Sequence, residues 1–300
     1  ATLLRAWDQG YSQLHAGSFD GSVAMLHNGP VKLFSERMNR AVYQSGALPA
    51  GHIAFGFLVR AGGDTCICGE EGTANSLLVF SGRSGFEFYS PENFEFFGIE
   101  IDTTETDDLV FQSMALTLEK VISQNSRSIT LDPRRAGRLG HLLNMVMPGQ
   151  ITQECITEWP DNGGTFNHGL VGSILDLLDY TENAQTVRGV PHWDVISAIR
   201  ELVVEGCDCP ISVAELTVRL GLSRRTLQNA CREVLGLSPL QYLRALRLSE
   251  ARRQLESAVP VTQAATQFGF WHFGYFARDY NNMFGELPSK TMRRAQQHMV

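Results

Sequence analysis

The sequence predicts an α+β protein in which a β-rich sandwich or barrel with flanking helices comes first and an all-helical domain follows. Between residues 21 and 102, short runs rich in aromatic and β-branched residues alternate with polar residues, as half-buried strands do. From about residue 106 onward, apolar residues instead recur at i, i+3 or i+4, and i+7, which is typical of amphipathic helices. The chain of 300 residues also exceeds what one small core requires, which suits two domains.

Several short segments of the first part have the composition of strands. Turn-forming pairs separate them, among them Asn28 with Gly29 and Gly62 with Gly63. Short strands at this spacing predict a small sandwich or barrel. The segments are 22–27, 31–38, 52–60, 65–70, 76–82, 86–90 and 94–101.

Helical spacing then dominates between about residues 106 and 180. One of these helices carries a wide apolar stripe that allows two interpretations: it covers the barrel, or it pairs with the same helix of a second copy across a twofold axis. The stripe consists of Leu170, Ile174, Leu177 and Leu178. The expected helices are 107–124, 133–147 and 167–181.

Both polarity and charge indicate where the chain divides. The polar stretch 180–191 ends at a proline, so we expect a linker there and domains at 1–188 and 189–300. The net charge of the chain is −7, but the first 200 residues hold 13 Lys and Arg against 23 Asp and Glu, and the last 100 hold 12 against 9. An acidic first part and a basic second part fit a regulatory or assembly domain joined to one that binds a polyanion.

Composition also bears on where the protein works. No run approaches the roughly 18 apolar residues that a membrane-spanning helix needs, and the start of the sequence lacks the layout of a signal peptide. We therefore expect a cytoplasmic protein whose cysteines are reduced thiols, because their spacing is not that of a zinc site. The six cysteines are Cys66, Cys68, Cys155, Cys207, Cys209 and Cys231.

An internal repeat organises the second domain. The stretch that begins at Val213 matches the stretch that begins at Val261, with an offset of 48 residues up to the glycines at 221 and 269. Beyond these glycines the offset is 49, so the second copy has one extra turn residue. In each copy a short helix stops at the glycine, which can adopt the left-handed conformation, and a turn leads into a second helix. Such a unit is a helix-turn-helix, expected at about 212–233 and 261–284.

A longer helix is expected between the two units, at about 239–256. Ser238 is its expected N-cap, and Pro239 stands at its first position. From Leu240 to Leu255 it would rise about 24 Å. A rigid helix of this length can place two recognition helices about one DNA turn apart, roughly 34 Å, with some bending of the DNA.

The second helix of the first copy has a polar face suited to DNA. Four side chains recur at i, i+3, i+4 and i+7, opposite the apolar positions: Arg225, Gln228, Asn229 and Arg232. Arginine can donate two hydrogen bonds to guanine, and Asn or Gln can pair with adenine, so this face suits a major groove. At the start of the helix, Ser223 and Arg224 are the expected phosphate-contacting residues.

The second copy is less typical. His272 and Arg278 are its candidate base-contacting residues, whereas Gly274 stands where the first copy has Arg225. We expect the second copy to contribute more to affinity and register than to the choice of sequence. Its candidate phosphate-contacting or positioning residues are Phe273, Arg293 and Arg294.

The part of the chain from about 191 to 294 resembles the DNA-binding domain of the AraC/XylS family of bacterial transcription regulators. The motifs that carry the resemblance are "WDVISAIRELVVEG", "SRRTLQNACREVLGLSP" and "GFWHFGYFARDYNNMFGELPSK". Within the family, the last two look most like the branch that contains the ethanolamine-operon regulator. The sequence departs from the family pattern at Cys231, where a larger apolar residue is common, and at Gly274, where a polar one is common.

This resemblance implies a function and partners. It implies that Arg225, Gln228 and Asn229 contact bases in the first unit, and His272 and Arg278 in the second. It further implies a cupin-like first domain that senses a small-molecule effector, nearby helices that form a homodimer, and recruitment of RNA polymerase at promoter DNA. On family grounds an activator is favoured over a repressor.

Two other functions remain open at this point. A cupin-like barrel with a metal would be an enzyme, but the histidines of the first domain are scattered without an H-x-H pair: His15, His27, His52, His141 and His168. We therefore expect no catalytic residue, no metal and no cofactor. The other alternative is a regulator whose first domain binds a protein instead of a small ligand, for which a well-packed barrel interior would be the telling observation.

Overall fold

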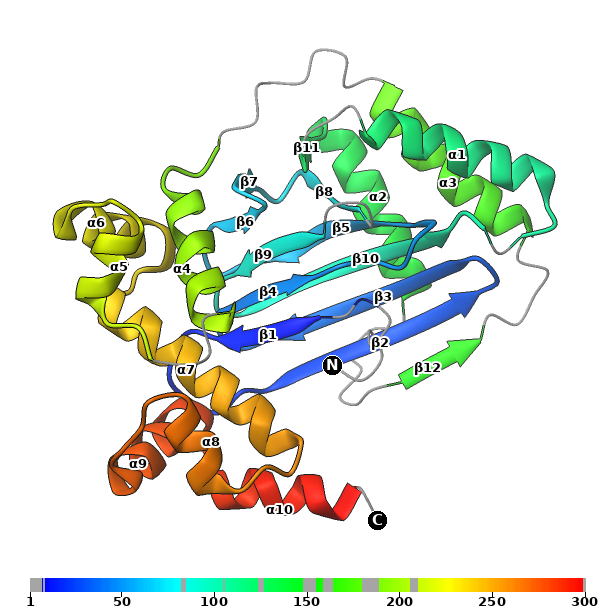
Figure 1. Cartoon of the computed structure of the whole chain (residues 1–300). Coiled ribbons are helices and arrows are strands. Elements are labelled where there is room, and N and C mark those ends of the chain that lie inside the picture. The colour runs from blue at the N-terminus through cyan, green and yellow to red at the C-terminus, as the bar shows by residue number, and fades with distance from the viewer. Residues whose placement is uncertain are drawn as a thin grey trace. The chain divides into compact units, whose positions relative to one another are not determined.

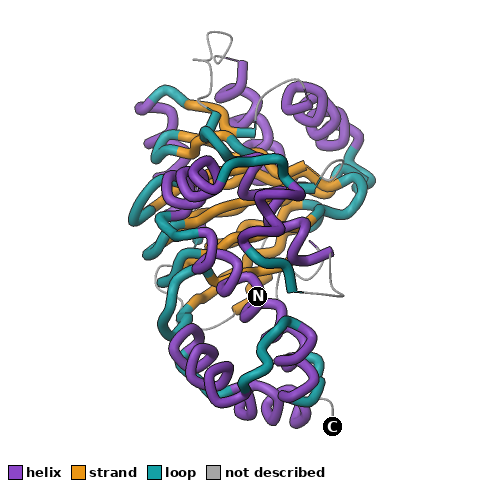
Figure 2. The backbone as a smooth tube through the Cα atoms, turned by 60° about the vertical axis from the view of Figure 1, so that its left-hand side comes forward, coloured by secondary structure: helices purple, strands orange, loops and turns teal. Residues whose placement is uncertain are grey.

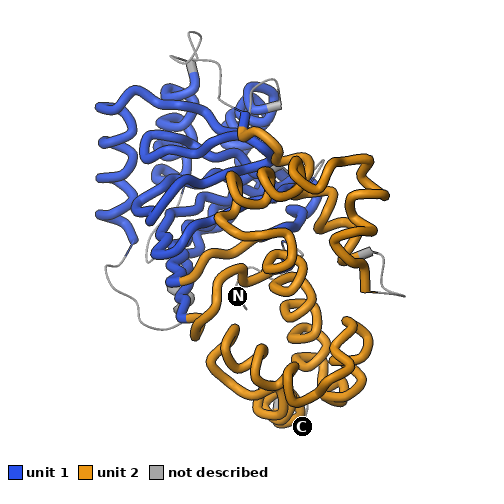
Figure 3. Tube along the Cα trace, turned by 90° about the vertical axis from the view of Figure 1, so that its left-hand side faces the viewer, with its two compact units in different colours: residues 1–10, 20–39, 44–189 blue, residues 11–19, 40–43, 190–300 orange. Residues whose placement is uncertain are grey.

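The computed structural model describes residues 7, 9–81, 85–104, 106–123, 127–147, 155–158, 164–179, 189–205 and 210–298. The chain divides into two compact units (Figure 3). The first contains residues 1–10, 20–39 and 44–189, and the second contains 11–19, 40–43 and 190–300. Residues 180–188 of the expected linker lie outside the described residues.

A seven-stranded sheet forms the centre of the first unit, with the strand order β11-β8-β5-β10-β3-β2-β12 (Figure 1). Neighbouring strands are antiparallel, except that β12 runs parallel to β2. The strands are β2 (Gly21–Asn28), β3 (Val31–Met38), β5 (His52–Arg60), β8 (Ser76–Ser81), β10 (Phe94–Asp102), β11 (Ser128–Thr130) and β12 (Cys155–Glu158).

A second sheet contributes three neighbouring strands to this unit, in the order β9-β6-β7. They are β9 (Phe86–Ser90), β6 (Thr65–Ile67) and β7 (Glu70–Gly72). The prediction of one strand over 65–70 is therefore wrong. Cys68 and Gly69 adopt positive φ angles of 48° and 84°, and this tight turn folds the segment back into an antiparallel pair.

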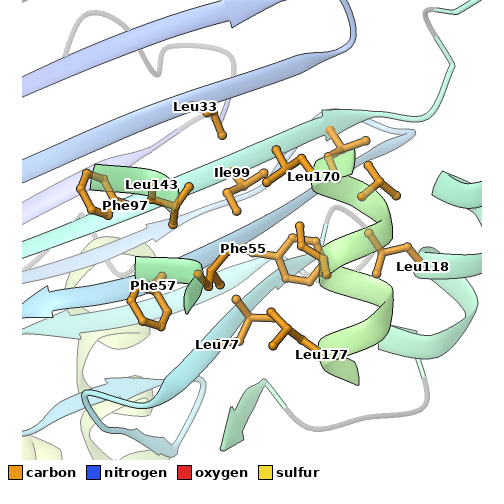
Figure 4. Packing of buried hydrophobic residues seen from close by; sticks show 14 of the residues in the cluster. Leu33, Phe55, Phe57, Leu77, Phe97, Ile99, Leu118, Leu143, Leu170 and Leu177 are labelled. Carbon is orange, nitrogen blue, oxygen red and sulfur yellow. The ribbon is translucent and has the colours of Figure 1, made fainter. Parts of the chain in front are cut away.

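Three helices pack on one face of the large sheet and bury the main apolar core. They are α1 (Leu109–Ser123), α2 (Pro133–Val146) and α3 (Gly164–Asp179). Leu170 and Leu177 of α3 lie against Phe55 and Leu77 of the sheet (Figure 4). The whole apolar stripe of α3 is buried within a single chain. The interpretation that this stripe pairs with a second copy is thus wrong, and the covering role is confirmed.

Aromatic rings fill the other side of the large sheet, where it faces β9. The Trp7 ring lies 5.4 Å from that of Phe34, 5.6 Å from Phe80 and 5.8 Å from Phe86, measured between ring centroids. Trp7 Nε1 also donates a hydrogen bond of 2.8 Å to Glu100 Oε2. Strands β10 and β3 pack so closely at one point that a Cβ at Gly98 would overlap the Phe34 ring.

The second unit is built on helices, and it confirms the repeat (Figure 2). Its helices are α4 (Trp193–Glu205), α5 (Val213–Arg219), α6 (Arg224–Leu235), α7 (Pro239–Glu256), α8 (Val261–Gln267), α9 (Phe273–Phe284) and α10 (Pro288–His298). Gly236 and Gly285 end α6 and α9 in the left-handed conformation, with φ of 68° and 73°. The α+β fold, with two helix-turn-helix units and a linking helix, is confirmed.

Two early segments of the chain also belong to the second unit. They carry most of β1 (Gly10–Gln13) and the start of β4 (Val42–Gly46). Gln13 Nε2 donates a hydrogen bond of 2.7 Å to the carbonyl oxygen of Met283, in the last turn of α9. The ring of Tyr43 stacks on that of Trp193 at the start of α4, with an interplanar angle of 11°.

Three of the six cysteines lie in described parts whose side chains are placed, and all three are free thiols: Cys66, Cys68 and Cys231. Burial raises the pKa of Cys231 to about 12, so the group is a neutral thiol packed against the core. The side chains of Cys155, Cys207 and Cys209 lie outside the described residues.

Candidate nucleic-acid interface

The predicted recognition face of α6 is exposed along its length. Leu227, Ala230, Cys231 and Leu235 are buried on the opposite side of the helix. The apolar spacing of the helix thus directs the polar positions outward. All four predicted base-contacting residues of the first copy are exposed: Arg225, Gln228, Asn229 and Arg232.

The two ends of α6 are held by local hydrogen bonds. Ser223 Oγ accepts a hydrogen bond of 3.1 Å from the backbone N–H of Thr226, as an N-cap does. At the other end, the N–H of Gly236 donates to the carbonyl of Arg232. Caps at both ends keep the helix regular up to its last turn, which fixes the mutual spacing of its polar side chains.

The arginines of α6 make this helix a concentrated positive site. The first turn contains no acidic residue, and in the described part of the chain no carboxylate pairs with Arg224, Arg225 or Arg232. The one glutamate of the helix, Glu233, instead lies 3.6 Å from His192, measured from Oε2 to Nε2. Exposed arginines without a carboxylate partner are suited to phosphate and guanine.

The second recognition helix, α9, presents a different surface. Arg278 is exposed, and its guanidinium lies 4.9 Å from the centroid of the Tyr275 ring. His272 is the N-cap of α9, but its side chain caps no backbone N–H. Gly274 lies in open space, with no atom within 4 Å of the place that a Cβ would occupy. The second copy thus exposes Arg278 and His272, but at the positions of Arg225 and Gln228 it has Gly274 and Ala277, which carry no hydrogen-bonding side chain.

Two exposed aromatic residues of the second copy, Trp271 and Tyr275, were not among the predicted site residues. Trp271 belongs to the turn between α8 and α9, which is one residue longer than the corresponding turn of the first copy. That extra residue was visible in the repeat and was the signal that could have identified this surface. Phe273, predicted as a positioning residue, is the first residue of α9 and is also exposed.

The predicted phosphate-contacting residues of α10 differ in how they are engaged. Arg294 donates hydrogen bonds of 3.0 Å from both terminal nitrogens to the carboxylate of Glu286. Arg293 is exposed, and within the described part of the chain its Nε donates only to the carbonyl of Ser289, at 3.2 Å. Of the two, Arg293 is the one whose charge is available to a phosphate.

The linking helix α7 is tied to both helix-turn-helix units. Arg244 forms an ion pair with Asp279 of α9, and Arg247 donates a hydrogen bond to the carbonyl of Ile211, just before α5. Buried residues occur on all sides of α7, among them Tyr242 and Leu246. Helix α7 thus packs against both helix-turn-helix units. These contacts fix the spacing of α6 and α9.

Outside this surface, the described residues contain no group of three or more His, Cys, Asp or Glu side chains that could hold a metal ion. Among the histidines of the first unit, His52 Nδ1 lies 2.8 Å from Glu100 Oε1, and His168 Nε2 lies 2.9 Å from Asp108 Oδ2. No helix in the described part of the chain is long and apolar enough to span a membrane.

Comparison with known proteins identifies relatives of the second unit. The family described as "Helix-turn-helix domain" matches residues 216–294. A "Probable thc operon regulatory protein" of Rhodococcus erythropolis is 38% identical over 88 residues, which cover 28% of this chain and 26% of the relative. An "XylDLEGF operon transcriptional activator 2" of Pseudomonas putida is 31% identical over 110 residues, which cover 35% of this chain and 68% of that relative.

A solved structure is also similar, that of a "probable AraC family transcriptional regulator" from Rhodopseudomonas palustris. It is 35% identical, with a TM-score of 0.31, and the match covers 34% of this chain and 97% of that one. The chain spans only 26% of the length of the Rhodococcus relative. For the Pseudomonas activator, however, the match covers 68% of the relative. With this match and both helix-turn-helix units in place, the chain belongs to the AraC/XylS family of transcription regulators.

Proposed function

We propose that this protein is a sequence-specific DNA-binding transcription regulator that binds promoter DNA with its two helix-turn-helix units in successive major-groove segments. The observation that carries the proposal is the exposed face of α6, on which Arg225, Gln228, Asn229 and Arg232 stand together on a capped helix. These are the residue types that distinguish guanine and adenine in the major groove. The protein acts without catalysis, on the DNA of the bacterial cytoplasm.

The two helix-turn-helix units have different roles in DNA binding. The first helix-turn-helix unit chooses the sequence, because its recognition helix has four exposed polar side chains, and its arginines have no carboxylate partner among the described residues. The second helix-turn-helix unit adds affinity and sets the register on the DNA. Arg278 and His272 lie near the bases, and Arg293 contacts a phosphate. The packed helix α7 sets the distance between them.

Besides DNA, we propose three further partners for the whole protein: RNA polymerase, a second copy of the chain and a small-molecule effector. The related Pseudomonas protein is described as a transcriptional activator, which supports activation, and with it RNA polymerase as a partner. A homodimer is supported by α1, where Leu109, Val110 and Leu116 are exposed although they are large and apolar. A small-molecule effector would act on the first compact unit, which contains the large sheet, and we assign no residues to it.

The test starts from the full chain. Fragments of genomic DNA that the protein retains are selected, and the affinity for a selected site is measured against salt concentration. Binding should weaken steeply as salt rises, because each phosphate contact releases condensed counterions. Arg225→Ala should weaken binding by roughly tenfold to a hundredfold and relax the preference at one base pair.

A matched control is Arg37→Ala, which removes an exposed arginine from β3 of the first unit, where it pairs with Glu95. This variant should bind the selected site as the unchanged protein does. The proposal is abandoned if the full chain binds no duplex at low salt, or if Arg225→Ala and Arg37→Ala behave alike. The homodimer is tested separately by sedimentation, where a single-chain mass at tens of micromolar would exclude it.

A further inference from the structure

The second helix-turn-helix unit exposes an unusual cluster of aromatic side chains, which we call the aromatic edge: Trp271, Phe273 and Tyr275. Their exposed fractions are 68%, 44% and 60%. They occupy alternate positions over five residues, in the turn before α9 and in its first turn. Large apolar side chains that are exposed have a free-energy cost in water, and several of them at one end of a helix mark a surface that can bind a partner.

The aromatic edge replaces polar residues of the first copy. By the repeat, Phe273 corresponds to Arg224 and Tyr275 to Thr226, whereas Trp271 is the extra residue and has no counterpart. The start of the recognition helix has therefore changed from a charged surface to an apolar one. Charge attraction cannot be the main source of affinity at these positions.

The adjoining face of α9 has lost hydrogen-bonding groups as well. Gly274 and Ala277 stand at the positions of Arg225 and Gln228, and a Cβ at Gly274 would meet nothing within 4 Å. At these positions little or no side chain projects from the helix, so its backbone can approach a partner closely. Arg278 remains, and its guanidinium is held over the Tyr275 ring at the border between the two surfaces.

We propose that the aromatic edge contacts the 5-methyl groups of thymines in the major-groove segment that faces α9. Thymine is the base that presents an apolar methyl group in the major groove, where it can be recognised by apolar contact. Besides the affinity and register proposed above, the second helix-turn-helix unit then adds a preference for thymine by burying methyl groups, whereas the first selects bases by hydrogen bonds. This inference rests on the proposed function and extends it from the first unit to the second.

The test removes methyl groups and nothing else. In the site selected with the full chain, each thymine is replaced by uracil, which keeps the hydrogen-bonding edge and lacks the methyl group. Replacement in the segment that faces α9 should weaken binding by about fourfold for each buried methyl group. A triple variant, Trp271→Ala with Phe273→Ala and Tyr275→Ala, should bind thymine and uracil sites there equally.

Two further variants keep the result interpretable. Leu240→Ala removes an exposed apolar side chain of comparable exposure, 67%, from α7 and should retain the preference for thymine. Tyr275→Phe keeps the ring and should retain the preference too. The triple variant counts as folded if it still shows the base preference that depends on Arg225 in the other segment.

The outcomes separate this inference from the proposed function. If the triple variant still prefers thymine over uracil in every segment, the aromatic edge does not contact methyl groups. If it binds DNA unchanged but fails to activate transcription with purified polymerase, the surface binds a protein and the inference is wrong. If the unchanged protein binds no DNA, the proposed function itself fails, whereas DNA binding that depends on Arg225 without any thymine preference overturns this inference alone.

Discussion

Arg294 and Glu286 form a bidentate ion pair in the second compact unit, with two hydrogen bonds of 3.0 Å each. Glu286 also accepts a hydrogen bond of 2.8 Å from Thr291 Oγ1. The positive charge of Arg294 is therefore largely used inside the domain, although its neighbour in sequence, Arg293, has no such partner among the described residues. This difference leads to the first two predictions.

The salt dependence of DNA binding should distinguish the two arginines. We expect Arg293→Ala to lower the slope of log affinity against log salt by about 0.9, the value for one phosphate contact. Arg294→Ala should change the slope by much less, because its charge is already neutralised by Glu286. The measurement is a series of binding titrations at increasing salt with one selected site. Equal changes in slope would show that the ion pair opens on DNA.

The same pair should make the stability of the second unit sensitive to acid. Burial acts to raise the pKa of Glu286, but hydrogen bonds from Arg294 and Thr291 outweigh it and leave the pKa below its ordinary value of 4.5. A lowered pKa stabilises the fold above the ordinary value, and this contribution is lost as pH falls through the lowered one. The difference in unfolding free energy between the unchanged protein and Glu286→Gln should therefore shrink below about pH 4.5. A difference that stays constant down to pH 3, in urea unfolding, would contradict this.

Gly98 should be among the least replaceable residues of the first unit. It lies in β10 opposite Phe34 of β3, and an added Cβ would overlap the Phe34 ring. Gly98→Ala should lower the free energy of unfolding by about 1–3 kcal/mol, because the ring has to move within a close-packed interior. The control is Gly137→Ala in α2, where nothing lies within 4 Å and the helix should gain about 0.5–1 kcal/mol. Chemical unfolding of both variants measures the contrast.

Trp7 should stabilise the first unit in two separable ways. Trp7→Ala removes a ring that contacts three others, and we expect a loss of about 3–5 kcal/mol in unfolding free energy. Trp7→Phe keeps a ring but removes the N–H that donates to the buried Glu100, for a loss of about 1–3 kcal/mol. If both variants lose the same amount, the hydrogen bond and not the ring accounts for the effect. As a control, the unfolding of the second compact unit is measured separately and should be the same in both variants as in the unchanged protein.

Much of the fold could be predicted because local patterns determined it. The linking helix was expected at about 239–256, and α7 has these bounds, since Ser238 caps its start and apolar positions continue to Leu255. The exposure of Arg225 and Gln228 likewise followed from the 3.6-residue period of α6. Patterns within a single element thus sufficed wherever one residue's environment depends on its near neighbours.

Features that depend on distant residues could not be predicted in the same way. The short strand β4 has few residues and no alternation, so its pairing comes from the rest of the sheet. Two of the three residues of the aromatic edge, Trp271 and Tyr275, were not predicted, because periodicity assigns large apolar residues to a core, and Tyr275 is nevertheless exposed. Gln13 and Met283 are 270 residues apart in the sequence, so no local pattern predicts that they lie side by side.

That last contact has a consequence for how the protein is made. The carbonyl of Met283 receives its hydrogen bond from Gln13, and Trp193 is covered by Tyr43, so the second unit needs pieces from the opposite end of the chain. On the ribosome, these early pieces emerge long before the helices they complete. A truncated product that begins at residue 190 would leave the end of α9 and the ring of Trp193 exposed to water. The contact of Gln13 with Met283 can therefore form only after almost the whole chain has been synthesised.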